Sequence, residues 1–354
     1  MDADRLLRDL KAGHTAALAR AISVVENARP GFERLLAEIH RDLGHARRIG
    51  ITGPPGAGKS TLVERLVGAY RAEGLRVAVV AVDPTSPFTG GALLGDRIRM
   101  ESVALDRDVY IRSMATRGSL GGLATTTREV CDVLDAAGFD RIVVETVGVG
   151  QSELDVGRMA DSTVLVLVPE SGDGIQTLKS GVMEVADIFV VNKADRPGAD
   201  RVRTDIELML GMRTGEALRN MPAHHGVDLK KIMNPARIAR EAASADQTET
   251  WTPPVLRTVA SKGEGIEELI TALDRHVRYL AASGELKRRR RQRLREQVID
   301  VTEHKIRQRL WRDDDTNAFI DSMLPALESG TATPFTVAEQ LLSRSGQLLT
   351  RTRS

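Results

Sequence analysis

The stretch GPPGAGKST at Gly53–Thr61 decides the fold of this chain. It matches the pattern G-x-x-x-x-G-K-[ST], and it lies between an apolar run, Arg48–Thr52, and a helix-length segment that starts near Lys59. Glycines let such a loop fold tightly, so that its backbone N–H groups and the helix N-terminus surround phosphate groups. An ordinary Gly-Pro turn into a helix rarely has the full pattern with these flanks. The sequence therefore predicts a phosphate-binding loop made by Gly53, Pro54, Pro55, Gly56, Ala57, Gly58, Lys59, Ser60 and Thr61.

Short apolar runs, rich in β-branched residues, recur on both sides of this loop. They are Arg48–Thr52, Arg76–Val82, Val109–Arg112, Arg141–Glu145, Thr163–Val168, Ile188–Asn192 and Val255–Val259. Their apolarity is too continuous for strands with one face in water, which favours buried parallel strands. Helix-length segments alternate with them, for example at Lys59–Glu73, Leu120–Ala137, Ile175–Ala186 and Gly265–Leu280. This alternation predicts an α/β fold of the P-loop NTPase class, with a doubly wound, mostly parallel sheet flanked by helices.

Both ends of the chain break the alternation and carry helical spacing of apolar residues instead. We therefore predict an N-terminal helical arm at residues 1–45, a P-loop domain at residues 46–282 and a C-terminal helical arm at residues 283–354. In the C-terminal arm the apolar positions are Leu294, Val298, Val301, Ile306 and Leu310. They predict a homodimer through this arm, and packing back onto the chain's own domain is the alternative.

The composition limits the classes of partner. Fifty Lys and Arg residues against 49 acids give a net charge of +1, so the whole molecule has no field suited to nucleic acid or to an anionic membrane. The single cysteine, Cys131, excludes an intramolecular disulfide, and no run reaches membrane-spanning length. These features predict a cytoplasmic protein. Lys287–Arg295 holds seven basic residues in nine, which we interpret as a solvated helix face.

A guanine-reading motif is predicted after the sixth apolar run, at Asn192-Lys193-Ala194-Asp195. A carboxylate at Asp195 can accept hydrogen bonds from guanine N1–H and the exocyclic amine, which adenine lacks. Asn192 can tie this loop to the phosphate loop, and the Lys193 stem can cover the ring. A four-residue polar turn alone would be a weak signal, but downstream of a phosphate loop it favours guanine specificity.

A second part of the guanine site is predicted at Ala260-Ser261-Lys262, directly after the last apolar run. This position would let the backbone N–H of Ala260 meet guanine O6. Val259 stands where GTPases commonly have Ser, so the expectation covers the backbone contact and not its support by a side chain.

Acidic residues at strand ends predict a magnesium site. Asp83 follows the second apolar run and Glu145 ends the fourth, and carboxylates at such positions can hold Mg²⁺ directly or through water. Ser60 of the phosphate loop would be a further ligand. Asp96, in a glycine-containing loop, is a third acidic candidate, and a helix cap or a solvated acid is its alternative interpretation. Gly148 would free a backbone N–H for the γ-phosphate, and no glutamine follows it directly to orient water, so intrinsic hydrolysis should be slow.

Together these motifs resemble the MeaB/ArgK family, GTPase chaperones of adenosylcobalamin-dependent acyl-CoA mutases. The matching stretches are ALARAI at Ala17–Ile22, Gly53–Thr61, VDPTS at Val82–Ser86, TGGALLGDR at Thr89–Arg97, ETVGVGQSE at Glu145–Glu153, Asn192–Asp195 and WTPPV at Trp251–Val255. The resemblance implies that Asp83, Asp96 and Glu145 are magnesium and switch acids, and that Lys59, Asp96 and Glu145 serve catalysis. It also implies that Gly172–Lys179 is an additional switch that reports the nucleotide state through Gln176 and Lys179. Without the resemblance, those two residues would read as exposed helix positions.

The resemblance implies a GTP hydrolase, with Mg²⁺ and bound GTP or GDP, that gates cofactor loading and protection of an acyl-CoA mutase. Methylmalonyl-CoA mutase is the expected partner, and the cobalamin adenosyltransferase is a further candidate. A metallochaperone-type GTPase is the alternative, although only Cys131 and the pair His224-His225 offer soft or borderline ligands. A nucleic-acid-associated GTPase that uses Lys287–Arg295 is a third class, and it lacks a recognisable RNA-binding module.

Overall fold

The computed structural model describes residues 3–84, 100–116, 122–146, 152–171, 180–214 and 250–350. The chain forms two compact units, Met1–Arg290 and Arg291–Ser354. The long helix α14 begins in the first unit and continues into the second.

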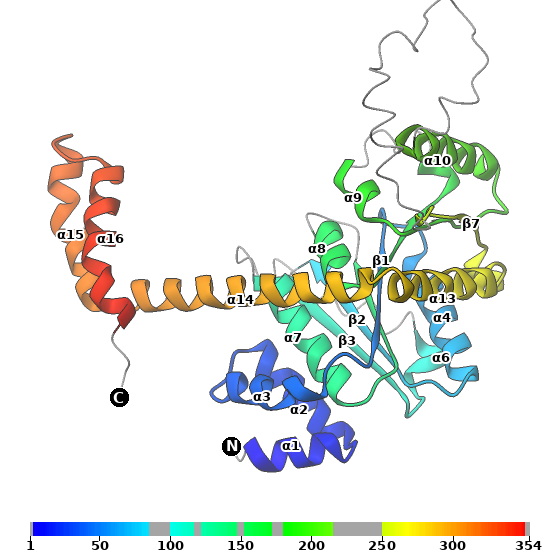
Figure 1. Cartoon of the computed structure of the whole chain (residues 1–354), viewed down its shortest axis with the longest axis horizontal. Helices are drawn as coiled ribbons and strands as arrows, with labels where there is room; N and C mark the ends of the chain where they lie inside the picture. Colours follow the sequence, from blue (N-terminus) through cyan, green and yellow to red (C-terminus); the bar gives the residue numbers. More distant parts are fainter. Residues whose placement is uncertain are drawn as a thin grey trace, which may run out of the picture. The chain divides into compact units, whose positions relative to one another are not determined.

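A seven-stranded sheet in the order β3-β2-β4-β1-β5-β6-β7 forms the centre of the first unit (Figure 1). Every neighbouring pair of strands is parallel. The strands are β1 (Arg47–Thr52), β2 (Val77–Pro84), β3 (Val109–Thr116), β4 (Arg141–Thr146), β5 (Ser162–Leu167), β6 (Ile188–Val191) and β7 (Val255–Arg257). Each of the seven apolar runs holds one strand, and the prediction of a doubly wound parallel sheet is confirmed.

Helices cover both faces of this sheet (Figure 1). One face packs against α4 (Lys59–Ala72), α6 (Glu101–Ala104) and α13 (Ile266–Ala282). The other face packs against α7 (Gly122–Ala136), α8 (Ser152–Met159), α9 (Ser180–Val185) and α10 (Ala199–Thr214). Side chains alternate between the two cores along a strand, so that Val79 of β2 faces the first and Val80 the second. Burial on both faces explains why the strands read as continuous apolar runs rather than as alternating ones.

The N-terminal helices share the second of these cores. They are α1 (Ala3–Lys11), α2 (Thr15–Glu26) and α3 (Phe32–Ile39), followed by the 3₁₀ turn η1 (His40–Asp42). Ile22 of α2 and Ile39 of α3 are fully buried in the cluster that contains α7 and strands β2 and β4. Asp135 of α7 accepts hydrogen bonds from the N–H groups of residues 44–46 at 2.8–3.1 Å, which fixes the path into β1. The predicted arm is therefore packed into the same compact unit as the sheet.

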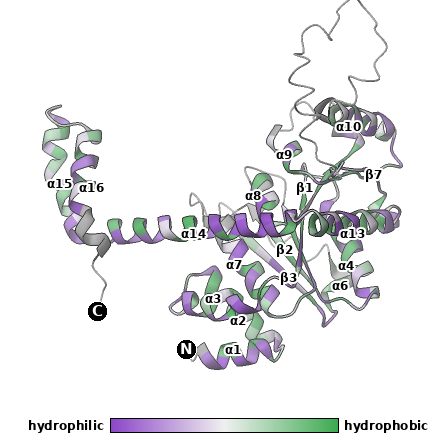
Figure 2. Cartoon of the chain, viewed as in Figure 1, coloured by the Kyte–Doolittle hydropathy of each residue, from purple (hydrophilic) through white to green (hydrophobic). Residues whose placement is uncertain are grey.

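The second unit holds most of α14 (Glu285–Trp311), together with α15 (Asp314–Glu328) and α16 (Pro334–Thr350). Asp313 caps α15 by accepting from the backbone N–H of Thr316 at 2.9 Å. Helix α14 has no buried residue over its described length, and the side chains of Leu294 and Val298 are 46% and 66% exposed. Figure 2 shows hydrophilic first turns on α14, with hydrophobic and hydrophilic residues mixed farther along.

The basic run at the start of α14 is only partly solvated, so its interpretation as a solvated face is wrong at two positions. Arg289 donates to both carboxylate oxygens of Asp187 at 2.9 and 3.0 Å, and Arg290 donates to Asp161 at 3.2 Å. Asp161 and Asp187 precede β5 and β6 and are 1% and 6% exposed. Buried carboxylates need charged partners, and the second turn of α14 supplies them. No helix in the described ranges is both long and apolar enough to cross a membrane.

Candidate functional site

The phosphate loop follows the central strand β1 and leads directly into α4. Gly53 and Gly58 have φ of +140° and +84°, a region that favours glycine. A Cβ at Gly53 would lie 2.1 Å from the carbonyl oxygen of Val166, and one at Gly58 would lie 2.4 Å from Nδ2 of Asn192. The loop can therefore pack against β5 and against the guanine-motif residue Asn192 only because these positions lack side chains.

The Lys59 ammonium lies inside this loop. Its side chain is almost completely buried, and Nζ donates to the carbonyl oxygens of Gly53 at 2.8 Å and Pro54 at 3.0 Å. A buried cation held by loop carbonyls places one positive charge at the N-terminus of α4, where helix N–H groups already favour anions.

Two predicted metal ligands are in direct contact. Ser60 Oγ donates to Glu145 Oε1 at 2.7 Å, and Glu145 is 3% exposed. Glu145 lies near the end of β4, and Ser60 lies in the first turn of α4, which the phosphate loop joins to β1. Strands β1 and β4 are neighbours, since Ile51 pairs with Glu145, and both end at the same edge of the sheet. Thr52 and Thr146, one residue farther along each strand, share a hydroxyl hydrogen bond at 3.1 Å. This edge brings a hydroxyl and a buried carboxylate together beside the phosphate loop.

The other predicted acids and switch residues are described less fully. The backbone of Asp83 lies at the same edge, because the preceding residue, Val82, pairs with Thr146 of β4. Asp96, Gly148, Gln176 and Lys179 lie outside the described residues.

Asn192 joins the phosphate loop to the end of β7. Its amide Nδ2 donates to the carbonyl oxygen of Ala57 at 2.8 Å. Its Oδ1 accepts from the Thr258 hydroxyl at 3.0 Å and from the Ala260 backbone N–H at 3.1 Å. The Asn192 side chain is 2% exposed, so this junction is shielded from water.

The N–H of Ala260 is therefore already engaged with Asn192. The prediction that it meets guanine O6 remains a prediction, and the base oxygen would have to share or replace the bond to Asn192. Ala260 begins the short 3₁₀ turn η4 (Ala260–Lys262), which also contains Ser261.

Lys193 and Asp195 lie at the exposed side of the same site. Lys193 adopts φ of +55° and its Nζ donates to the Gly56 carbonyl oxygen at 2.8 Å. Asp195 forms an ion pair with Lys262 at 3.2 Å, and this hydrogen-bonded lysine holds the pKa of Asp195 below its usual range. The Asp195 carboxylate is thus ionised at neutral pH and can accept hydrogen bonds from a base.

Two residues of this network were not found from the sequence. Thr258, which is 1% exposed, holds Oδ1 of Asn192, and a hydroxyl residue at a strand end was its only signal. Arg65 of α4 donates from Nε to the Ala260 carbonyl oxygen at 3.1 Å and from Nη2 to the Ser261 carbonyl oxygen at 2.8 Å. Nothing in the local sequence distinguishes Arg65 from any other exposed helix arginine.

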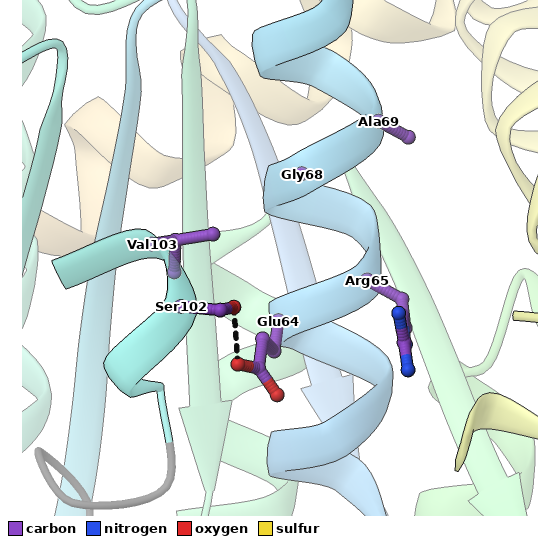
Figure 3. Close-up of a pocket in the computed structure, with 6 residues that line it drawn as sticks. All are labelled: Glu64, Arg65, Gly68, Ala69, Ser102 and Val103. Atoms are coloured by element: carbon purple, nitrogen blue, oxygen red, sulfur yellow. Dashed lines mark hydrogen bonds between the residues drawn. The ribbon is translucent and has the colours of Figure 1, made fainter. Parts of the chain in front are cut away.

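A hollow of about 330 Å³ lies along α4, beside α6. It is lined by Glu64, Arg65, Gly68, Ala69, Ser102 and Val103. Figure 3 shows Glu64 pointing toward Ser102 of α6, to which it is hydrogen-bonded at 2.5 Å, with Arg65 on the other flank of α4. The hollow contains none of the phosphate-loop residues, but it includes Arg65, which also binds the Ala260–Lys262 turn.

Known proteins resemble the chain over most of its length. The family described as methylmalonyl-CoA mutase-associated GTPase MeaB matches residues 18–315. A relative in Pyrococcus abyssi is 47% identical over 298 residues, which are 84% of this chain and 83% of the relative. GTPase ArgK of Escherichia coli is 35% identical over 339 residues, which are 95% and 94% of the two chains. Among solved structures, the LAO/AO transport system kinase is 30% identical, with a TM-score of 0.63 and 96% of both chains covered. The chain therefore belongs to the MeaB family, and it is a GTP-binding P-loop GTPase.

Proposed function

We propose that this GTPase is a chaperone that gates adenosylcobalamin loading and protection of an acyl-CoA mutase, with methylmalonyl-CoA mutase as the partner. The observation that carries the proposal is the family match over residues 18–315, because that family is described by its association with this mutase. The matched range contains the nucleotide site and helices on both sides of it. The reaction is the hydrolysis of GTP to GDP and phosphate.

On the phosphate side, we assign Lys59 to neutralising the β- and γ-phosphates. The Ser60 hydroxyl and the Glu145 carboxylate are in contact, and both are hard oxygen ligands of the kind that Mg²⁺ prefers. Ser60, Asp83, Asp96 and Glu145 are the proposed residues of that metal site, and the ion would offset the charge that develops on the phosphates. The backbone N–H of Gly148 is assigned to the γ-phosphate.

On the base side, Asp195 accepts from the guanine N1–H and exocyclic amine, and the low pKa of this carboxyl supports the role. The stem of Lys193 covers the ring, while the turn Ala260-Ser261-Lys262 lies beside it. Asn192 holds both halves of the site together through its bonds to Ala57 and Ala260.

The mutase is proposed to raise the hydrolysis rate, because no glutamine directly follows Gly148 in the sequence to orient the attacking water. A partner that orders the Asp96 loop and the Gly172–Lys179 segment would complete such a site. By thermodynamic linkage, GTP and GDP must then differ in their effect on mutase affinity. A homodimer, a cytoplasmic location and the cobalamin adenosyltransferase as a second partner belong to the same proposal, on the strength of the family resemblance.

The test is phosphate release by the purified protein, with and without purified acyl-CoA mutases from the same organism. We expect one mutase to accelerate hydrolysis and to bind with different affinity in the presence of GTP and GDP. The variant Gln176→Ala with Lys179→Ala should weaken this stimulation and leave basal hydrolysis nearly unchanged, since neither residue is assigned to the phosphates or the base. If no mutase changes the rate, and GTP and GDP leave mutase binding equal, the chaperone role is excluded.

A further inference from the structure

Arg65 connects α4, which follows the phosphate loop, to the Ala260–Lys262 turn on the base side of the nucleotide site. Arg65 lies six residues after Lys59 on α4, which places it about 9 Å along the helix from that lysine. From there its guanidinium reaches the carbonyl oxygens of Ala260 and Ser261. Two other side chains, Asn192 and Lys193, bind the phosphate loop itself at the carbonyl oxygens of Ala57 and Gly56.

The geometry of these bonds requires an arginine. Nε and Nη2 are neighbouring donors on one edge of a planar guanidinium, and they bind two successive carbonyl groups at 3.1 and 2.8 Å. A lysine carries a single ammonium group and does not reproduce this fork. Hydrogen bonds from a charged donor are stronger than neutral ones, so they restrain the position of the turn.

The turn that Arg65 holds carries the contacts proposed to read the base. Its first residue, Ala260, donates its N–H to Asn192, and its last residue, Lys262, pairs with Asp195 at 3.2 Å. The turn is only three residues long and is followed by Gly263 and Gly265, both with positive φ. Backbone hydrogen bonds from Lys262 to Val259 and from Gly263 to Ala260 fix the shape of the turn. They do not fix its distance from the phosphate loop, which depends on bonds to other segments, among them those from Arg65.

We propose that Arg65 is a positioning residue for guanine recognition, which holds the Ala260–Lys262 turn at a fixed distance from the phosphate loop. It does not touch the nucleotide and acts through the turn. The inference rests on the proposed guanine site, and it is independent of the proposed mutase partner.

The test measures dissociation of a fluorescent GDP from the purified full chain, together with steady-state GTP hydrolysis, in the absence of any mutase. Arg65→Ala should accelerate GDP dissociation about tenfold, which corresponds to about 1.4 kcal/mol. The KM for GTP should rise by a similar factor while kcat stays within about twofold, because the phosphate loop and its lysine are unchanged. Arg65→Lys should give an intermediate dissociation rate, because it restores the charge and not the fork.

Arg71→Ala is the matched control. Arg71 lies on the same helix and makes comparable bonds, at 2.7 Å to the Leu75 carbonyl oxygen and at 2.8 and 3.0 Å to Asp106 and Asp108, none of which belongs to the nucleotide site. Arg71→Ala should lower the urea midpoint of unfolding, because it removes a structural contact. It should leave the GDP dissociation rate within about twofold of wild type, because that contact lies outside the nucleotide site. A generic loosening of α4 would instead accelerate dissociation in both variants.

Two further variants separate the possible failures. Arg65→Ala combined with Lys262→Ala should accelerate dissociation by less than the product of the two single effects, because both act through one turn. Asp195→Asn shows how far GDP binding weakens when a residue of the proposed guanine site itself is changed. If Asp195→Asn weakens GDP binding and Arg65→Ala does not, or if Arg65→Ala lowers kcat and kcat/KM equally, Arg65 is not a positioning residue. If Asp195→Asn also has no effect, the guanine site is misassigned.

Discussion

At the scale of single residues, the nucleotide site is held by polar side chains that each join two segments of the chain. Asn192 joins the phosphate loop to the end of β7, and Ser60 joins that loop to the end of β4. Both junctions are shielded from water, since Asn192 and Glu145 are 2% and 3% exposed. Hydrogen bonds in such surroundings are costly to leave unmade, so changes at these residues should act on binding and geometry together.

Guanine selectivity should depend on the charge of Asp195. Asp195→Asn replaces two acceptor positions by an amide that can also donate, so GTP binding should weaken by about 3 kcal/mol, or roughly a hundredfold. The same amide can donate to the additional oxygen of xanthine, and binding of xanthine nucleotides should improve. Nucleotide titrations of wild type and variant measure both effects. Equal affinity of the wild type for ATP and GTP would show that the motif is misassigned.

A buried acid on α7 should make stability depend on pH. Burial raises the pKa of Glu129 to about 7, helped by the nearby Asp132, and the side chain is 7% exposed. A carboxyl whose pKa is raised on folding stabilises the protein below its unfolded pKa of 4.5, and this contribution is lost as the pH rises toward 7.

Glu129→Gln removes the titration and keeps a neutral side chain of similar shape. At pH 8 the variant should be more stable than wild type by up to about 3 kcal/mol, and near pH 4.5 the two should be nearly equal. Urea unfolding of both proteins from pH 4.5 to 8 measures the difference. A stability difference that does not change over this range would mean that Glu129 keeps an ordinary pKa.

At the scale of elements, ion pairs with buried aspartates attach the second turn of α14 to the amino ends of β5 and β6. Burial alone would raise the pKa of Asp187, but the contact with His276 at 3.3 Å and the hydrogen bonds from Arg289 lower it overall. Trp251 is part of the same cluster, since its indole N–H donates to the Asp187 carbonyl oxygen at 2.8 Å and its ring lies 4.7 Å from that of His276.

Arg289→Met should destabilise the first unit by about 2 kcal/mol, below the range for a fully buried pair, because Arg289 is one-third exposed and His276 remains beside Asp187. Arg288→Met is the control, since Arg288 is 77% exposed and pairs only with Glu285 among the described contacts. Arg288→Met should change the free energy of unfolding by no more than about 0.5 kcal/mol. Urea unfolding in a Trp311→Phe background makes Trp251 the sole fluorescent reporter. An equal loss of unfolding free energy in Arg289→Met and Arg288→Met would contradict the attachment of α14 through Arg289.

At the scale of the whole molecule, the second unit leaves apolar side chains of α14 exposed. Leu294, Val298 and Ile306 are 46%, 66% and 42% exposed. Apolar residues at helical spacing on an uncovered helix favour contact with a second copy, as the sequence predicted, and the homodimer remains a prediction.

Leu294→Glu combined with Val298→Glu should convert a dimer to a monomer, because two charges would be buried in the contact. Arg295→Glu changes the charge of the same exposed helix without removing apolar surface and should leave the mass unchanged. Light scattering on the full-length proteins gives the mass directly. A double variant with the same mass as wild type would exclude this face as the dimer contact.

The sequence by itself determined the strands and the phosphate loop, for a local reason. A strand buried on both faces must be apolar throughout, so each of the seven runs marked one strand to within a few residues. The phosphate loop was visible because a tight loop that packs on Val166 and Asn192 requires glycine at Gly53 and Gly58. Its neighbour in the site, the turn at Ala260, was found from its position after the last strand.

Only the tertiary structure decided which of several identical residues have a partner. Arg288, Arg289 and Arg290 are consecutive, yet only the last two reach the buried Asp187 and Asp161, because successive helix residues point about 100° apart. Arg65 likewise gains its role only when the sheet brings the Ala260–Lys262 turn beside α4 from some 195 positions away in the sequence. Such contacts depend on strand order, and strand order is set by packing between distant segments that no local pattern records.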